Sequence, residues 1–238
     1  MRIGFFSAKG GVGKTIISIN VASLLSESGK NVLVVDTDEN NSASISIGLI
    51  NFPQNLSKVL KGIININQAI YPTNFGFKIL PAGEELKEFN SSIFNSLNFD
   101  YIIFDTEPGI SRKNLEIAKI CDEIFLITQA ETISIYAILR TLKEFEKENI
   151  KVSGLIINRF NKKSIDPSEV YDFLGIPIVA ILKEEKNMQE SLLRGIPYVF
   201  LDPFSNFSIE LKNFASKFFG IHFTKPLFYK IFRILRWI

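Results

Sequence analysis

The sequence Lys9-Gly10-Gly11-Val12-Gly13-Lys14-Thr15 decides the fold. It follows an apolar run at residues 2–7 and precedes a helical pattern at 15–28. Glycines let backbone N–H groups turn inward around a phosphate, because side chains would block the approach. In that setting Lys14 neutralises the β- and γ-phosphates, the Thr15 hydroxyl coordinates Mg²⁺, and the helix N-terminus adds partial positive charge. The segment predicts a phosphate-binding loop between the first strand and the first helix.

Apolar runs alternate with helical patterns along the rest of the chain. The runs that we expect to form strands lie at 2–7, 31–35, 77–80, 101–104, 123–128, 152–158 and 176–182. The helical patterns lie at 15–28, 85–96, 113–119, 133–148, 168–174, 187–193 and 209–219. Most strand runs are continuously apolar, which is typical of strands covered on both faces. The order predicts a doubly wound, mostly parallel α/β sheet with ligands at the carboxyl ends of its strands.

The phosphate loop resembles the deviant KGGxGK[ST] loop of the MinD/ParA family of ATPases, since Ala8 stands where the general P-loop pattern has glycine. Other segments are similar to further motifs of that family, namely 32–38 (a strand ending in DxD), 79–83, 100–109 (the Walker B strand and second switch), 156–159 and 194–197. The resemblance implies a P-loop NTPase fold of the MinD/ParA type. It also implies a MinD-like ATPase that uses ATP and Mg²⁺.

The resemblance gives each of three acids a role. Asp36 would support the Mg²⁺ shell, and Asp38 would orient or activate the attacking water. Asp105 closes an apolar strand, where a carboxylate can hold Mg²⁺ through water, although a helix or turn cap is the alternative interpretation. The predicted metal set is Thr15, Asp36 and Asp105, and the predicted catalytic set is Lys9, Lys14 and Asp38.

Lys9 is the family's signature lysine by the same resemblance. It would reach across a nucleotide-bound homodimer to the partner's phosphates, where a second cation stabilises the charge that builds during transfer. A plain surface charge is the alternative interpretation. The segment 156–159 is similar to the family's adenine pocket. The predicted nucleotide-binding residues are therefore Lys9, Gly10, Gly11, Val12, Gly13, Lys14, Thr15, Asn158 and Arg159.

Several positions depart from the family pattern. They are Ile16 for a second threonine, Glu39-Asn40-Asn41 for Pro-Gln-Gly, Glu107 for proline or alanine, and Lys183 for proline. None of them lies in the core of the phosphate loop. We expect slow hydrolysis without a partner protein.

Composition excludes several classes of protein. One Cys and one His exclude a disulfide framework and any zinc or iron–sulfur site built from this chain alone. The apolar stretch at residues 3–6 is too short for a signal peptide, and no run reaches the 18 or so apolar residues of a membrane span. We expect a cytoplasmic protein.

The charge balance is uneven along the chain. The first 210 residues hold 21 basic and 25 acidic side chains, whereas the last 28 hold six basic and no acidic ones. On a helical projection, residues 225–238 separate into an apolar arc and a basic face bordered by Tyr229 and Trp237. These features are typical of a helix that lies in a membrane interface. A last helix packed on protein and a DNA-binding arm are the alternatives.

The sequence thus predicts an ATPase domain at 1–224 and an amphipathic helix at 225–238. The expected protein dimerises on Mg-ATP, binds anionic lipid on the inner face of the cell membrane, and leaves after hydrolysis stimulated by an unidentified activator. Such a cycle would serve spatial positioning, of a division site for example. Two alternatives remain: a ParA-type partition ATPase that binds DNA nonspecifically, and a nucleotide-dependent scaffold with little hydrolysis.

Overall fold

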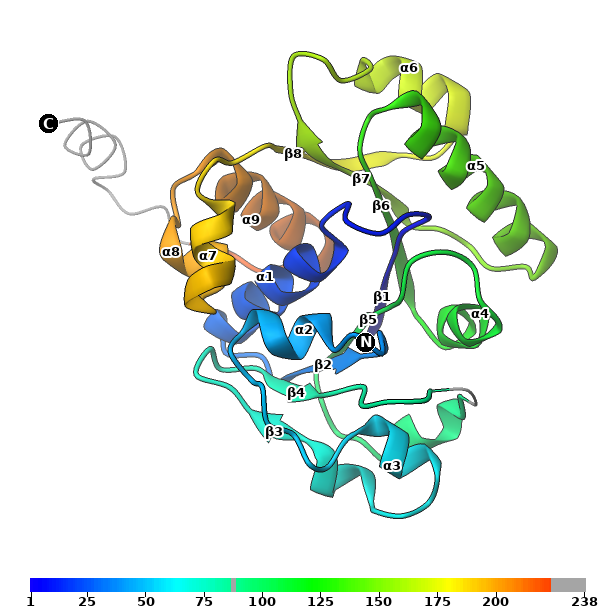
Figure 1. Cartoon of the computed structure of the whole chain (residues 1–238). Helices are drawn as coiled ribbons and strands as arrows, with labels where there is room; N and C mark the ends of the chain where they lie inside the picture. The colour runs from blue at the N-terminus through cyan, green and yellow to red at the C-terminus, as the bar shows by residue number, and fades with distance from the viewer. Residues whose placement is uncertain (87–88, 224–238) are drawn as a thin grey trace, which may run out of the picture.

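A single sheet organises the part of the chain that the computed structural model describes, residues 1–86 and 89–223 (Figure 1). Its strands are β1 (Arg2–Phe6), β2 (Val32–Asp36), β3 (Tyr71–Pro72), β4 (Lys78–Leu80), β5 (Tyr101–Asp105), β6 (Glu123–Thr128), β7 (Gly154–Phe160) and β8 (Ile178–Lys183). They lie in the order β3-β4-β2-β5-β1-β6-β7-β8, and only the β3–β4 pair is antiparallel. The predicted doubly wound, mostly parallel fold is confirmed.

Helices cover both faces of this sheet (Figure 1). On one side lie α1 (Lys14–Glu27), α2 (Ser42–Ser46), α7 (Met188–Arg194), α8 (Tyr198–Leu201) and α9 (Asn206–Phe219). The other face is covered by α4 (Arg112–Lys119), α5 (Thr132–Lys147) and α6 (Pro167–Leu174), and α3 (Leu56–Leu60) lies near the β3–β4 edge. Two short 3₁₀ turns, η1 (Ile66–Ala69) and η2 (Ser91–Phe94), complete the described elements.

Two apolar cores result, one on each face of the sheet. Successive strand residues alternate between them, so that Phe5 and Val34 join the α1–α9 side while Phe6 and Val35 join the α4–α5 side. Since both faces are packed, the strands read as continuous apolar runs in the sequence. This is why their positions could be predicted to within a few residues.

Helix α1 lies between the sheet and the outer helices, and its residues from Ile17 to Leu25 are all buried. Its buried polar residues Ser18, Asn20 and Ser23 have hydrogen-bond partners. The Asn20 amide donates to Ile16 O (2.7 Å) and its oxygen accepts from Val199 N in α8 (2.8 Å). The helix that begins at the phosphate loop is therefore held on all sides, which fixes the loop at its start.

The helix predicted at 85–96 is wrong. Glu85 adopts a left-handed φ of 60°, and the only regular structure in the described part of this segment is the turn η2. The backbone N–H of Leu86 donates to Glu39 Oε1 (2.8 Å). The segment is thus held by a contact to a residue distant in the sequence, and the short elements α2, α3, η1, β3 and α8 were not predicted.

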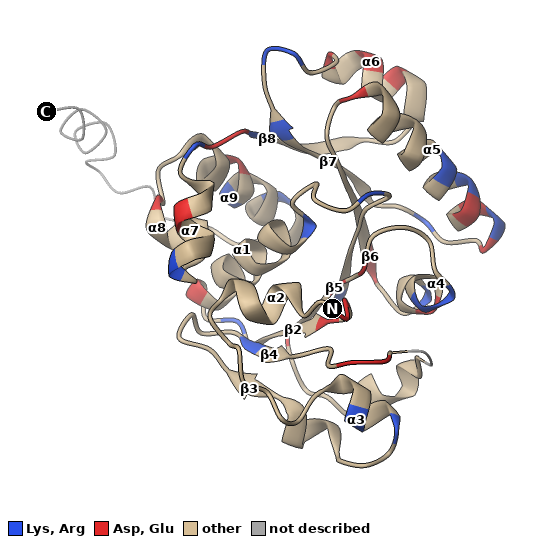
Figure 2. Cartoon of the chain, in the orientation of Figure 1, with Lys and Arg blue, Asp and Glu red and all other residues tan. Residues whose placement is uncertain are grey.

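Charges of both signs are interspersed on the outer helices α4, α5 and α7 (Figure 2). Among the described residues, no helix is both long and apolar enough to cross a bilayer. The predicted amphipathic helix at 225–238 lies outside the described residues.

Candidate functional site

The predicted site residues lie at the carboxyl ends of three adjacent strands, β2, β5 and β1, on one edge of the sheet. Asp36 ends β2 and Asp105 ends β5, and the two are register partners across that strand pair. Phe5 of β1 pairs with Asp105 from the other side, so the phosphate loop after β1 begins next to both acids. The carboxyl ends of parallel strands meet at a shared edge, which is where α/β sheets bind ligands.

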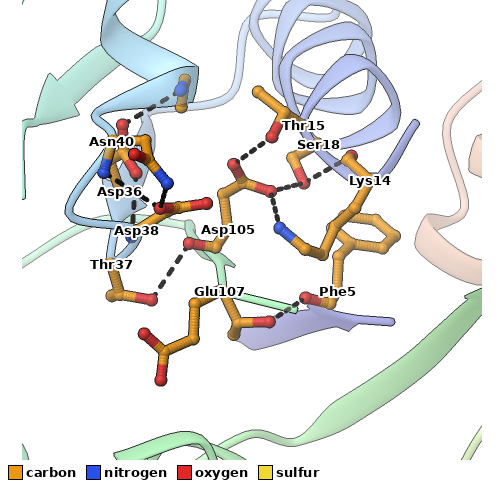
Figure 3. A network of polar contacts seen from close by, with 12 residues as sticks. Phe5, Lys14, Thr15, Ser18, Asp36, Thr37, Asp38, Asn40, Asp105 and Glu107 are labelled. Atoms are coloured by element: carbon orange, nitrogen blue, oxygen red, sulfur yellow. Dashed lines mark hydrogen bonds and ion pairs between the residues drawn. The ribbon is translucent and has the colours of Figure 1, made fainter. Parts of the chain in front are cut away.

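Asp105 is the centre of a buried polar network in front of α1 (Figure 3). Its Oδ1 lies 3.2 Å from Lys14 Nζ and accepts from Ser18 Oγ at 3.0 Å, while its Oδ2 accepts from Thr15 Oγ1 at 2.7 Å. Asp105 is fully buried and Lys14 is 6% exposed. A buried carboxylate is retained at low cost only when it is paired and hydrogen-bonded, as here. Ser18 was missed by sequence reasoning because a serine inside a helix carries no signal of its own.

Asp36 is fully buried and caps the short helix α2. Its Oδ2 accepts from the backbone N–H groups of Ala43 (3.0 Å) and Ser44 (3.2 Å), and its Oδ1 accepts from Asp38 N (3.1 Å). Burial and then the nearby Asp105 carboxylate raise the pKa of Asp36 from 3.8 to about 7, against the opposing effect of those amide hydrogen bonds and Lys14. A cation at this point would favour the ionised form of Asp36.

Asp38 lies on the loop after β2 and is 8% exposed. Its Oδ1 accepts from both the backbone N–H (3.0 Å) and the side-chain amide (2.8 Å) of Asn40 (Figure 3). The side-chain amide of Asn41 bridges this loop to Gly83, donating to its carbonyl (3.4 Å) and accepting from its N–H (2.8 Å). Asn40 and Asn41, two of the positions that depart from the family pattern, thus hold the loop that carries Asp38.

Asn158, in the C-terminal half of β7, contacts the phosphate loop from the side. Its side-chain amide donates to the carbonyl of Val12 at 2.7 Å, and the residue is 5% exposed. The backbone of Gly13 has φ +95°, and a Cβ there would lie 2.2 Å from Asn158 Nδ2. Glycine is therefore needed at position 13 for both its conformation and its lack of a side chain.

A cavity of about 410 Å³ opens in front of the loop. It is lined by residues 7 and 9–16 together with Asp38, Asn40, Ser42, Ser46, Pro108, Arg159 and Leu192. The predicted residues Lys9, Asp38 and Arg159 thus meet at one space with the phosphate loop. Ser7 Oγ, in a residue only 2% exposed, is a buried hydroxyl with no hydrogen-bond partner within the described chain. A ligand oxygen in this cavity is the kind of partner that such a group lacks.

The residues present fit a magnesium–nucleotide. Mg²⁺ in such sites is held by one or two carboxylates together with substrate phosphates and water. Thr15 and Asp105 supply the hydroxyl and carboxylate side by side, and Lys14 supplies the cation for phosphate. Within the described residues, no group of three or more His, Cys, Asp or Glu side chains could hold a metal ion by itself.

The loop after β5 is fastened at several points. The Thr106 hydroxyl donates to Phe5 O (2.9 Å), and Gly109 N donates to Ser7 O (2.8 Å). The side-chain amide of Asn114 in α4 donates to the carbonyls of Glu107 (3.0 Å) and Gly109 (2.8 Å). The loop is therefore tied both to the end of β1, just before the phosphate loop, and to the first turn of α4.

Residues 3–198 match a family model described as the CobQ/CobB/MinD/ParA nucleotide binding domain. The chain belongs to this family. An uncharacterised ATP-binding protein of Methanocaldococcus jannaschii is 27% identical over 239 residues, a match that covers 95% of this chain and 90% of that protein.

Solved structures of this family are also similar to the chain. The septum site-determining protein MinD of Pyrococcus horikoshii in complex with Mg-ADP superposes with a TM-score of 0.83 at 27% identity, covering 91% of this chain and 94% of that one. The cell division ATPase MinD of Pyrococcus furiosus gives a TM-score of 0.84 at 26% identity, covering 92% and 98%. The MinD/ParA resemblance predicted from the phosphate loop is confirmed.

Proposed function

We propose that this chain is a MinD-like ATPase that dimerises on Mg-ATP, docks on an anionic membrane surface through residues 225–238, and is released after hydrolysis. In this cycle the protein serves the positioning of another cell component. The nucleotide-binding family and the similarity to MinD structures support the coarser part of this statement, an ATP-binding protein of the MinD type.

One observation carries the catalytic part of the proposal. The cavity in front of the phosphate loop is lined at once by Lys9, Asp38 and residues 10–15. Phosphoryl transfer needs positioning and charge neutralisation rather than covalent chemistry by the protein, so a carboxylate and two lysines around one cavity suit it. Lys14 and the loop N–H groups bind the phosphates, and Asp38 accepts a hydrogen bond from the attacking water and aligns it.

Mg²⁺, when bound, neutralises phosphate charge, and Thr15 and Asp105 are the residues that would hold it. Asp36 lies beside Asp105 on the same edge of the sheet, and a bound cation would favour its ionised form. Among the described residues, no carboxylate lies within ion-pair distance of Lys9. Its ammonium is therefore available for phosphate, including the phosphate of a second copy in a dimer.

The membrane part of the proposal follows from the charge of the chain. The first 210 residues carry more acids than bases, and an anionic surface repels such a body. Four basic residues at 225–238 add about 1 kcal/mol each near anionic lipid. One such segment binds weakly, and two joined in a dimer bind far better by avidity. Nucleotide-dependent dimerisation then controls residence on the membrane.

Hydrolysis is tested by turnover of the purified full chain with Mg-ATP, comparing wild type with Asp38→Ala. We expect Asp38→Ala to keep nucleotide binding and to lose about 10²-fold or more in kcat, because the water loses its orientation. Asp172→Ala, on the exposed side of α6, is the matched control and keeps the wild-type rate. Equal turnover in wild type and Asp38→Ala would favour a scaffold over an ATPase.

Membrane docking is tested by co-sedimentation with anionic liposomes in the presence of ATP or ADP, with the full chain and a chain ending at Thr224. We expect only the full chain with ATP to sediment. Full-length protein that stays in the supernatant with ATP contradicts the membrane role. If it is instead retained on DNA in a salt-sensitive manner, the partition-type alternative is the better one.

A further inference from the structure

The first turn of helix α4 contains a buried lysine that the proposed chemistry does not use. Lys113 is 8% exposed, although it is the second residue of a helix whose other charged side chains face solvent. A lysine is retained at such a depth only when its ammonium has partners. Two partners come from different loops at the edge of the nucleotide cavity.

The first partner is Glu107, which stands where the MinD/ParA second switch usually has proline or alanine. Its Oε2 lies 2.8 Å from Lys113 Nζ. The backbone carbonyl of the same residue accepts from the side-chain amide of Asn114 at 3.0 Å. Consecutive residues of α4 therefore hold Glu107 by both its side chain and its backbone, and its neighbour Pro108 lines the cavity.

The second partner lies on the loop after β2. Lys113 Nζ donates to the carbonyl of Thr37 at 2.8 Å. Thr37 stands between Asp36 and Asp38, and its own N–H (2.9 Å) and hydroxyl (3.0 Å) donate to the carbonyl of Asp105 (Figure 3). The Lys113 ammonium thus links the carbonyl of Thr37, which precedes Asp38, to the carboxylate of Glu107, which precedes Pro108.

We propose that Lys113 is a positioning residue, which with Glu107 couples the loop that borders the nucleotide at Pro108 to the loop that carries Asp38. This inference rests on the proposed ATPase function for its catalytic consequence. A displacement of the loop after β5, when phosphate enters the cavity, moves Glu107, and Lys113 passes that movement to Thr37. In the absence of the ammonium, Glu107 turns to solvent, since its side chain is already 28% exposed, and the Thr37 carbonyl loses its charged donor.

The test compares Lys113→Met, Lys113→Arg and Glu107→Gln with wild type in the full chain. Methionine keeps the length of the side chain and removes the charge and the donors, whereas arginine keeps both. Lys119→Met is the matched control, because Lys119 lies on the same helix and forms ion pairs with Glu116 (3.4 Å) and Glu148 (3.1 Å) on the surface. Two readouts are taken: amide hydrogen exchange of residues 36–42 without nucleotide, and kcat and KM for ATP.

For Lys113→Met we expect exchange of residues 36–42 to rise roughly tenfold and kcat to fall by about the same factor, with KM changed less than about twofold. Glu107→Gln gives smaller changes in exchange and in kcat, in the same directions. Lys113→Arg keeps most of the wild-type kcat and protection from exchange, and Lys119→Met matches wild type in both readouts. If Lys113 were only structural, Lys113→Met would instead lower thermal stability and would not lower kcat selectively over KM.

Unchanged exchange at 36–42 in Lys113→Met overturns the coupling, and a loss confined to KM overturns the positioning role. If wild type itself does not turn over ATP, the proposed hydrolysis fails. The exchange comparison then still decides whether Lys113 holds the Asp38 loop.

Discussion

Gly13→Ala should damage this protein far more than the same change at Gly11, and the reason lies in Asn158. Both glycines have positive φ, +95° at Gly13 and +77° at Gly11, so alanine is strained at either position by about 1–2 kcal/mol. A Cβ at Gly11 meets nothing within 4 Å, whereas one at Gly13 lies 2.2 Å from Asn158 Nδ2. The Asn158 amide must therefore move away from Val12.

The extra cost follows from the contact that is broken. The hydrogen bond from Asn158 to the Val12 carbonyl is 2.7 Å long, and both residues are buried. Leaving such groups unpaired costs about 1–3 kcal/mol. The total for Gly13→Ala is thus about 2–5 kcal/mol, against about 1–2 kcal/mol for Gly11→Ala. At this chain length each kcal/mol lowers Tm by roughly 2–4 °C.

Urea unfolding of the nucleotide-free protein measures these values, with Asn158→Ala as the second arm of a double-mutant cycle. In the Asn158→Ala background the clash is absent, so Gly13→Ala should cost only the conformational strain, the same as Gly11→Ala. Equal losses for the two glycines in the wild-type background would refute the reasoning. So would a Gly13→Ala penalty that persists in full after Asn158 is removed.

Three further predictions concern pH and packing. Because burial and Asp105 raise the pKa of Asp36 to about 7 in the folded state, folded protein retains its proton where unfolded protein has lost it. The contribution of Asp36 to the free energy of unfolding is therefore full below pH 4 and falls by up to about 1.4 kcal/mol per pH unit toward pH 7. Urea unfolding measured from pH 4.5 to 8 should show this slope in wild type and a flatter one in Asp36→Asn. Gly195→Ala should destabilise the protein more than Gly175→Ala. Both glycines end a helix in the left-handed conformation (φ +62° and +68°), but only at Gly195 would a Cβ approach backbone, at 3.1 Å from Gly48 N. Thermal melts of the two variants test this, and equal losses in Tm would contradict the packing argument. Burial raises the pKa of the Cys121 thiol, so its alkylation at pH 8 should be much slower than in unfolded protein, and a rate equal to that of the unfolded chain would exclude this environment.

The fold was predictable because its signals are local and periodic. Strands packed on both faces appear as unbroken apolar runs, and the glycines of the phosphate loop mark the join between β1 and α1. Thr15, Lys14 and Asp105 could be brought together because the ends of parallel strands share an edge.

Contacts between distant residues could not be predicted. Helix α2 depends on a carboxylate at the end of β2, and the expected helix at 85–96 is replaced by a segment whose Leu86 N–H donates to Glu39. Nothing in the sequence distinguishes Lys113 from Lys119, the exposed lysine of the same helix. The roles predicted for Asn158 and Arg159 at the adenine remain predictions, since the structure places Asn158 against the phosphate-loop backbone.

Helix α2 is capped by Asp36, a residue that also belongs to the predicted magnesium site. The helix has five residues, no acid in its first turn or base in its last, and no capping hydrogen bond from the side chain of its N-cap residue, Asn41. A helix this short does not persist on its own, so the amides of Ala43 and Ser44 in its first turn rely on the Asp36 carboxyl group, whose ionisation responds to the charges around it. Ser42 and Ser46 of this helix line the nucleotide cavity. Part of the cavity wall is thus stabilised by hydrogen bonds to the Asp36 carboxyl group, so a change in the charge bound in the cavity also changes the support of that wall.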